Sequence, residues 1–212
     1  MNWYHQFYHR QNELSGVYTG DIEAYHHDRV KLITRQRPVV DPKVLELGAG
    51  GGQVACATAL AGYDTTMIEY VKGFTDHAQH LMKKHTIENL TVLNGDFYTI
   101  ELAANFDVIT YWDGFGIGSD DEQIALLKRC ASWLNPDGIV LIDVNTPWYW
   151  ANVRGQTMQF GTAQRRYDFD VYESRMLDTW WDSHTPDDKV TQSLRCYAPA
   201  DLKLLLRNTG LL

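Results

Sequence analysis

Hydrophobic and polar positions follow two different rhythms along this chain. From about residue 44 to residue 144, short apolar runs are separated by longer stretches with the 3.6-residue spacing of helices. Apolar runs that alternate with helices predict a parallel sheet with helices on both faces. The expected strands are 44–47, 64–68, 90–93, 106–112 and 139–144, and the expected helices are 53–61, 73–85 and 120–134.

After residue 147 the rhythm changes. Residues 166–172 alternate with period two, and 176–181 and 190–197 do so less cleanly, which predicts antiparallel strands. A last helix is expected at 199–208, with Pro199 at its start. Ahead of the parallel region, residues 3–15 and 22–33 are expected to be helical, the second with Asp21 as its N-cap.

These rhythms predict a Rossmann-like, mostly parallel α/β sheet with an antiparallel, aromatic-rich flap. The expected organisation is a single domain of four parts: an N-terminal helical cover (1–40), a Rossmann-like core (41–146), the flap (147–198) and the final helix (199–212). Seven Trp and twelve Tyr crowd the first thirty or so residues and the last third. We therefore expect a plain scaffold with aromatic covers.

A glycine-rich turn carries the first chemical signal. Gly48, Gly50 and Gly52 follow an expected strand and open an expected helix, which is the context in which such a motif binds a ligand. The last position of the dinucleotide pattern G-x-G-x-x-G is Gln53 here, which disfavours a dinucleotide. Glu46 ahead of the turn suits a ligand with an ammonium group. Glu69, about 20 residues further on, suits ribose hydroxyls.

Several motifs in this order resemble the class I S-adenosylmethionine-dependent methyltransferases of the small-molecule type. The resemblance runs from about residue 44 to residue 144, with the glycine turn as the first motif and Gly95-Asp96-Phe97 as a later one. Residues 106–113 resemble the family's fourth motif, and 134–138 its turn before the fifth strand. The final helix resembles the family's last helix. Two further strands normally follow it, so we expect the terminal strands of the sheet to be missing.

The resemblance implies S-adenosylmethionine as cofactor and S-adenosylhomocysteine as product. The glycine turn would line the methionine end and the ribose, Glu69 would accept the ribose hydroxyls, and Asp96 would meet the adenine. The full set of cofactor-binding residues that it implies is Glu46, Gly48, Ala49, Gly50, Gly52, Glu69, Tyr70, Gly95, Asp96, Phe97, Tyr111 and Trp112.

Methyl transfer from a sulfonium is an in-line displacement that proximity and orientation can accelerate. A base is required only if the acceptor must lose a proton. Asp113, at the end of the fourth strand, and His26 are the candidate catalytic residues, and His27 and His184 are weaker ones. Two neighbouring histidines on a helix point in different directions, so at most one of His26 and His27 can face the site.

The acceptor is expected to be a small molecule. The N-P-P-Y or D-P-P-Y signature of amino-methylating nucleic-acid enzymes is absent, and the net charge is −8. Aromatic segments after residue 147 could hold a planar or cationic acceptor, or they could simply pack the flap. A nucleic-acid or protein methyltransferase, and a non-catalytic protein that binds S-adenosylmethionine, stay open as alternatives.

Cysteine content and hydropathy bear on the expected location of the protein and on its expected partners. Three cysteines without C-x-x-C spacing favour reduced thiols in a cytoplasmic protein and no metal site. No apolar run approaches the ~20 residues that cross a bilayer, so no membrane partner is expected. The sheet edge left by missing terminal strands could promote a homodimer.

Overall fold

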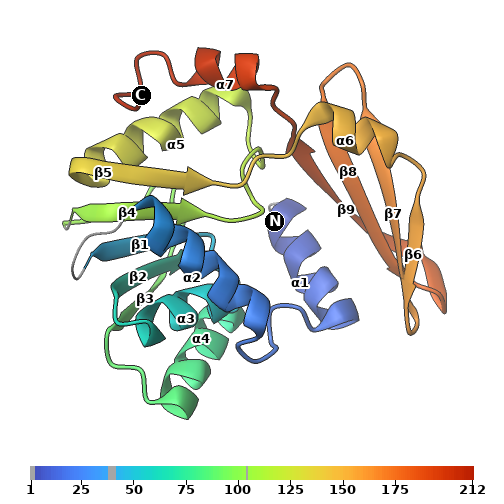
Figure 1. The fold of residues 1–212 in the computed structure, drawn as a ribbon. Coiled ribbons are helices and arrows are strands. Elements are labelled where there is room, and N and C mark those ends of the chain that lie inside the picture. Colours follow the sequence, from blue (N-terminus) through green and yellow to red (C-terminus); the bar gives the residue numbers. More distant parts are fainter. Residues whose placement is uncertain (1–2, 38–41, 104) are drawn as a thin grey trace. The chain divides into compact units, whose positions relative to one another are not determined.

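The computed structural model describes residues 3–37, 42–103 and 105–212, and the chain divides into two compact units (Figure 1). Residues 18–112 and 126–142 form the parallel unit, and residues 3–17, 113–125 and 143–212 form the antiparallel unit. The expected N-terminal cover is thus shared between the units, because its first helix belongs with the antiparallel sheet and its second with the parallel sheet. The expected boundary at residues 40 and 41 lies outside the described residues.

The parallel unit confirms the predicted Rossmann-like sheet. Its strands lie in the order β3-β2-β1-β4-β5, and every neighbouring pair is parallel. The order reverses between β1 and β4, and open α/β sheets bind ligands outside the carboxyl ends of the strands at such a point. The strands are β1 (Lys43–Leu47), β2 (Asp64–Glu69), β3 (Leu90–Asn94), β4 (Phe106–Tyr111) and β5 (Leu134–Ile142).

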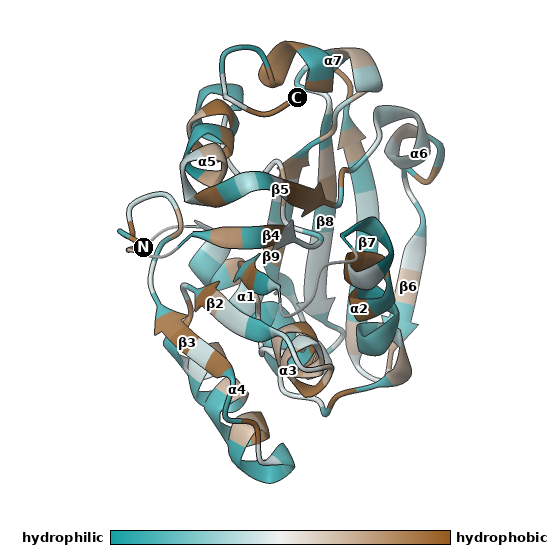
Figure 2. Ribbon diagram, turned by 60° about the vertical axis from the view of Figure 1, so that its left-hand side comes forward, coloured by the Kyte–Doolittle hydropathy of each residue, from teal (hydrophilic) through white to brown (hydrophobic). Residues whose placement is uncertain are grey.

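Helices cover both faces of this sheet. The crossovers through α3 and α4 run in one direction along the sheet, whereas the crossover through α5 runs in the other. Because such crossovers are right-handed, α5 lies on the opposite face. In Figure 2, where residues are coloured by hydropathy, β3 is mainly hydrophobic and α4 is mainly hydrophilic. The helices are α2 (Ala24–Gln36), α3 (Gln53–Leu60), α4 (Lys72–His85) and α5 (Asp120–Trp133).

Two apolar clusters hold this unit together. Ile33 of α2 packs on Val44 of β1 and Val108 of β4, with Trp112 partly buried against them. The second cluster joins α3 and α4 to Met67 of β2. Both clusters draw on residues at alternate positions of the strands, which is the period-two rule for one face of a sheet.

Two local expectations differ from the structure. Asp21 is wrong as the N-cap, because Glu23 caps α2 and forms a capping box with His26, whereas Asp21 binds Lys84 and His85 at the end of α4. The turn expected before the fifth strand is a bulge within β5. Phe106 pairs with Leu134 and Val108 with Ile139, so the residues between them leave the ladder.

The antiparallel unit confirms the predicted flap. Its sheet has the order β6-β7-β8-β9 with antiparallel neighbours throughout. The helix α6 and the strand β6 were not predicted, because six and four residues are too short to show a periodicity. The elements are α1 (Trp3–Ser15), α6 (Pro147–Asn152), β6 (Thr157–Phe160), β7 (Ala163–Asp170), β8 (Arg175–Asp182), β9 (Thr185–Arg195) and α7 (Pro199–Leu205).

One face of the antiparallel sheet contains both apolar and charged side chains. Phe7 of α1 packs on Ala163 and Trp180. Beside them, Arg165 donates to both oxygens of the fully buried Asp178 at 2.8 and 2.7 Å, and Trp180 Nε1 donates to the same carboxylate at 3.0 Å. Trp180 and Tyr167 also flank the guanidinium of Arg165. An ion pair this well satisfied can be buried.

Of the helices described in the two units, none is long and apolar enough to cross a membrane.

Candidate cofactor and active site

The glycine loop between β1 and α3 has a conformation that side chains would prevent. Gly48, Gly50 and Gly52 have φ values of 58°, 54° and 80°, which L-residues rarely adopt. A Cβ on Gly51 would lie 1.7 Å from the carbonyl oxygen of Tyr18, and one on Gly52 would lie 2.4 Å from the Cβ of Ala78. The loop is therefore packed closely between the segment before α2 and the helix α4.

Glu69, at the end of β2, braces this loop. Its carboxylate accepts hydrogen bonds from Gly50 N at 2.8 Å and from Val71 N at 2.7 Å. Its carbonyl oxygen accepts from Gly95 N at 3.0 Å and from Asn94 Nδ2 at 2.9 Å. Burial raises the pKa of Glu69 to about 7, against the lowering effect of the backbone donors. The Tyr70 backbone also acts as a donor to this carboxylate, which has about four lone-pair sites in all.

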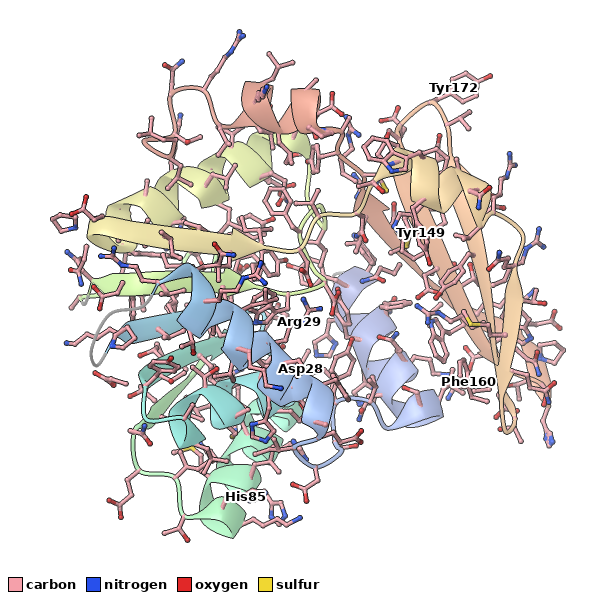
Figure 3. The ribbon with its side chains drawn as sticks, in the orientation of Figure 1. Asp28, Arg29, His85, Tyr149, Phe160 and Tyr172 are labelled. Atoms are coloured by element: carbon pink, nitrogen blue, oxygen red, sulfur yellow. The ribbon has the colours of Figure 1, made fainter. Side chains whose placement is uncertain are left out.

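Glu46 is a second buried carboxylate, located on β1 directly before the loop. It is 3% exposed, and burial raises its pKa to about 8, although Arg29 on α2 opposes this shift. The guanidinium of Arg29 (labelled in Figure 3) lies 4.8 Å from the centre of the Trp112 ring. Trp112 Nε1 is a buried donor for which no acceptor is found in the described part of the chain. A buried carboxyl group, a guanidinium group and a buried indole N–H therefore lie near the ends of β1 and β4.

The burial of Glu46 predicts a pH-dependent stability. Its pKa in the folded protein, about 8, lies above its ordinary value of 4.5, so the stability that depends on the neutral form is complete below pH 4.5 and is lost as the pH rises towards 8. We expect this group to lower the free energy of unfolding by about 4 kcal/mol across that range. Glu46→Gln should flatten the decline, because an amide does not ionise. Urea unfolding of both proteins at pH 5, 6, 7 and 8 measures it, and parallel curves would contradict the assignment.

An aromatic wall stands beside the first glycine. Phe97 and Tyr111 have ring centres 5.3 Å apart, and a Cβ on Gly48 would lie 3.3 Å from the Tyr111 ring. Arg129 of α5 holds the Phe97 carbonyl oxygen through Nε at 3.0 Å. Asp96 accepts from Tyr98 N at 2.8 Å, which shapes the turn after β3. The structure therefore brings the first glycine together with two of the predicted aromatic residues.

The other predicted cofactor residues lie at the same strand ends. Ala49 N donates to the carbonyl oxygen of Ile68 at 3.1 Å, which joins the glycine loop to β2. Tyr70 follows β2 and is 43% exposed.

The two predicted catalytic residues belong to different units, His26 to the parallel unit and Asp113 to the antiparallel unit. His26 is buried at the start of α2, where its Nδ1 accepts from Glu23 N at 2.8 Å, and burial lowers its pKa. The lone pair of His26 Nδ1 is therefore occupied by the hydrogen bond that caps α2. Asp113 is the first residue of the antiparallel unit and has a φ of 56°. Of the weaker candidates, His27 is exposed on α2, and His184 is exposed between β8 and β9.

Comparison with known proteins agrees with this geometry. Residues 44–138 match the model of a methyltransferase domain. Over this region, the chain is similar to methyltransferase domains. A cypemycin N-terminal methyltransferase from a Streptomyces species is 30% identical over 120 residues, which are 56% of this chain and 48% of that protein. The chain thus spans about half the length of this curated relative.

Solved structures extend the likeness to both units of the chain. The CcbJ methyltransferase from Streptomyces caelestis has a TM-score of 0.76 at 20% identity, over 91% of this chain and 80% of that one. An amino pentose methyltransferase from Micromonospora echinaspora, solved with S-adenosylmethionine, has a TM-score of 0.63 at 18% identity, over 99% of this chain and 90% of that one. At these identities the likeness establishes the fold.

Sequence reasoning missed several residues that shape this candidate site. Tyr18 covers Gly50, Arg29 faces Glu46, and Arg129 fixes the turn that carries Phe97. These contacts join residues that are far apart in the chain, so no local sequence motif predicts them. The one available signal was Arg29, which shares the helical segment whose apolar residues Val30 and Ile33 face the core.

The cysteines of this chain are poor nucleophiles. Cys56, Cys130 and Cys196 are buried free thiols, and burial raises their pKa values to about 12, 12 and 11. A nucleophilic cysteine needs the opposite shift. In the residues for which the structure gives positions, no group of three or more acidic, histidine or cysteine side chains could hold a metal ion.

Proposed function

We propose that this chain binds S-adenosylmethionine and transfers its methyl group to a small-molecule acceptor. The observation that carries the proposal is the glycine loop at the β1/β4 reversal, held to β2 by the hydrogen bond from Gly50 N to Glu69. The solved relative with bound S-adenosylmethionine supports the choice of cofactor.

The described residues fit this cofactor. Gly48, Gly50 and Gly52 let the backbone turn sharply between β1 and α3, so the loop ends at the N-terminus of α3, where backbone N–H groups can meet a ligand. Glu46 is a buried carboxyl group that can pair with the ammonium of the methionine part when it ionises, and Glu69 can accept a hydrogen bond from a ribose hydroxyl. When bound, S-adenosylmethionine supplies an electrophilic methyl group on a sulfonium.

The chain's own residues then act by position. Phe97 and Tyr111 form an apolar wall beside Gly48 and limit the access of water there. Gly95, Asp96 and Tyr70 are proposed to hold the adenine side, and Trp112 the end of β4. Asp113 is proposed as the base for an acceptor that must lose a proton, and His26 as the alternative.

A small-molecule acceptor is supported by the amino pentose specificity that the Micromonospora enzyme's name states, and by the net charge of −8. An acidic protein lacks the overall electrostatic attraction that non-specific nucleic-acid binding uses. Cytoplasmic location and homodimer formation accompany this proposal as further expectations.

Replacing Glu69 tests the cofactor assignment. Glu69→Ala removes the acceptor for Gly50 N and the proposed acceptor for the ribose, so we expect S-adenosylhomocysteine to bind about 10- to 150-fold more weakly, which corresponds to about 1.5–3 kcal/mol. Titration calorimetry measures this affinity. Glu88→Ala, which removes an exposed acid from the same unit, is the control and should bind like the parent.

Two results would contradict the proposal. No binding of S-adenosylmethionine or S-adenosylhomocysteine to the parent protein would overturn the function. Equal affinities of the parent and Glu69→Ala would overturn the role of Glu69 alone.

A further inference from the structure

A short segment lies over the glycine loop. Residues 18–23, which we call the strap, join α1 to α2. The ring of Tyr18 covers Gly50, where a built Cβ would lie 2.8 Å from the ring, and its carbonyl oxygen leaves no room for a Cβ on Gly51. The Tyr18 ring also packs on Phe74 of α4, with ring centres 4.7 Å apart. The strap therefore limits how far this part of the loop can move.

The other side of the same loop is held by α4. His77 Nδ1 lies 2.8 Å from the carbonyl oxygen of Gly51, and the Cβ of Ala78 approaches Gly52. The loop is thus clamped between α4, which belongs to an apolar core, and the strap, which has no helix or strand of its own.

The strap is fastened at its far end by polar side chains. The carboxylate of Asp21 binds Lys84 Nζ and lies 2.8 Å from His85 Nε2, at the end of α4 (His85 is labelled in Figure 3). Gln53 Nε2 donates to the carbonyl oxygen of Gly20 at 3.3 Å, and Ile22 packs on the apolar cluster of α3 and α4. Apart from Ile22 and Tyr18, these attachments are polar, and the Asp21 cluster is about half exposed.

Two glycines flank these attachments. Gly16 has a φ of 68° and donates its N–H to the Asn12 carbonyl oxygen at 2.7 Å, and a Cβ built on Gly16 or on Gly20 would meet no atom within 4 Å. Open space around two glycines lets the backbone change direction without a steric cost. Exposed ion pairs such as that of Asp21 are weak. The strap thus combines a bendable backbone with a weak fastening over a tightly packed loop.

We propose that the strap closes the cofactor site and that its fastening by Asp21 to Lys84 and His85 sets the rate at which the cofactor leaves. The inference rests on the proposed function, because it takes the glycine loop as the cofactor's seat. Asp21 acts here as a positioning residue: it keeps the strap on the loop and need not touch the ligand.

Release of S-adenosylhomocysteine tests the proposal. The bound protein is mixed with excess S-adenosylmethionine in a stopped-flow instrument, and tryptophan fluorescence follows the exchange. Asp21→Asn should release the ligand about three- to fivefold faster at low salt, which is the range expected for an exposed ion pair. Raising the salt to about 0.5 M should accelerate release from the parent by a similar factor, because salt screens the pair, and should change release from Asp21→Asn little.

The chain offers a matched control. Asp28, labelled in Figure 3, is an exposed acid on α2 that pairs with Lys31 at 2.7 Å. Asp28→Asn makes the same change of charge on the same unit and should release the ligand like the parent. Lys84→Gln should accelerate release, and adding it to Asp21→Asn should give little further acceleration, because both changes remove one interaction. Thermal unfolding should give closely similar midpoints for all variants, which excludes a general loss of stability.

The outcomes separate the two proposals. Failure of the parent to bind S-adenosylhomocysteine would overturn the proposed function, and the strap's role with it. Binding with equal release rates for the parent, Asp21→Asn and Asp28→Asn would overturn the strap alone. Faster release that keeps the parent's salt dependence would also count against it, because the fastening would then not be the screened contact.

Discussion

Replacing Asp178 with alanine is expected to lower the free energy of unfolding of the antiparallel unit by about 3–5 kcal/mol. Asp178 is fully buried and neutralises Arg165, whose side chain is 22% exposed. Its removal leaves the guanidinium without its anionic partner and Trp180 Nε1 without its acceptor. The cost comes mainly from these unpaired donors, because a charge inside a protein has lost its hydration.

A surface pair in the same sheet provides the control. Arg154 donates to Asp168 at 2.7 Å, as short as the buried contact, but both side chains are substantially exposed. Asp168→Ala should therefore cost no more than about 1 kcal/mol. Urea unfolding followed by tryptophan fluorescence compares the two variants. Equal losses would show that the distance between the charges, and not their burial, decides the stability.

Gly52→Ala is expected to have the second large effect, about 2–5 kcal/mol of stability and on the order of 100-fold in affinity for S-adenosylhomocysteine. The methyl group would lie 2.4 Å from the Cβ of Ala78, and the residue would have to keep a φ of 80° or move the loop. Left-handed backbone costs an L-residue about 1–2 kcal/mol, and overpacking adds about 1–3 kcal/mol. A shift of about 1 Å in a positioned site is enough for a 100-fold loss.

Gly73→Ala isolates the steric cause. Gly73 lies in the first turn of α4 and has open space where a Cβ would be. Alanine is the better helix former there, so this variant should be as stable as the parent or more stable by about 0.5–1 kcal/mol. Thermal unfolding and calorimetry apply to both variants. A Gly52→Ala protein with unchanged affinity would remove the glycine loop from the cofactor site.

The sequence predicted the parallel sheet well because its signals are local. Each strand contains a short apolar run, and the glycine loop follows a strand and opens a helix, so both can be read within a dozen residues. The spacing from Gly48 to Glu69 also predicted that Glu69 belongs with the loop, and the hydrogen bond from Gly50 N brings the two together. The predicted use of Glu69 for ribose is a separate matter, which the binding experiment decides.

Prediction from local sequence patterns failed where a polar side chain binds a residue that is far away in the chain. Asp21 has the ordinary signature of an N-cap, but Lys84 and His85, more than sixty residues away in the chain, take its carboxylate, and Glu23 caps the helix instead. In the flap, the period-two pattern predicted strands without showing which face is buried. Arg165 and Asp178 occupy the buried face, and their pairing is visible only when β7 lies beside β8.

The sequence by itself determined the order of the elements in the parallel sheet, the position of the glycine loop and the change from a parallel to an antiparallel sheet. These follow from periodicity and from the backbone freedom of glycine, which are properties of neighbouring residues. Only the tertiary structure decided that Tyr18 covers the loop, that Arg29 faces Glu46, and that both glutamates are buried enough to raise their pKa values. Desolvation and close packing depend on everything that surrounds a group, and residues far apart in the chain supply those surroundings.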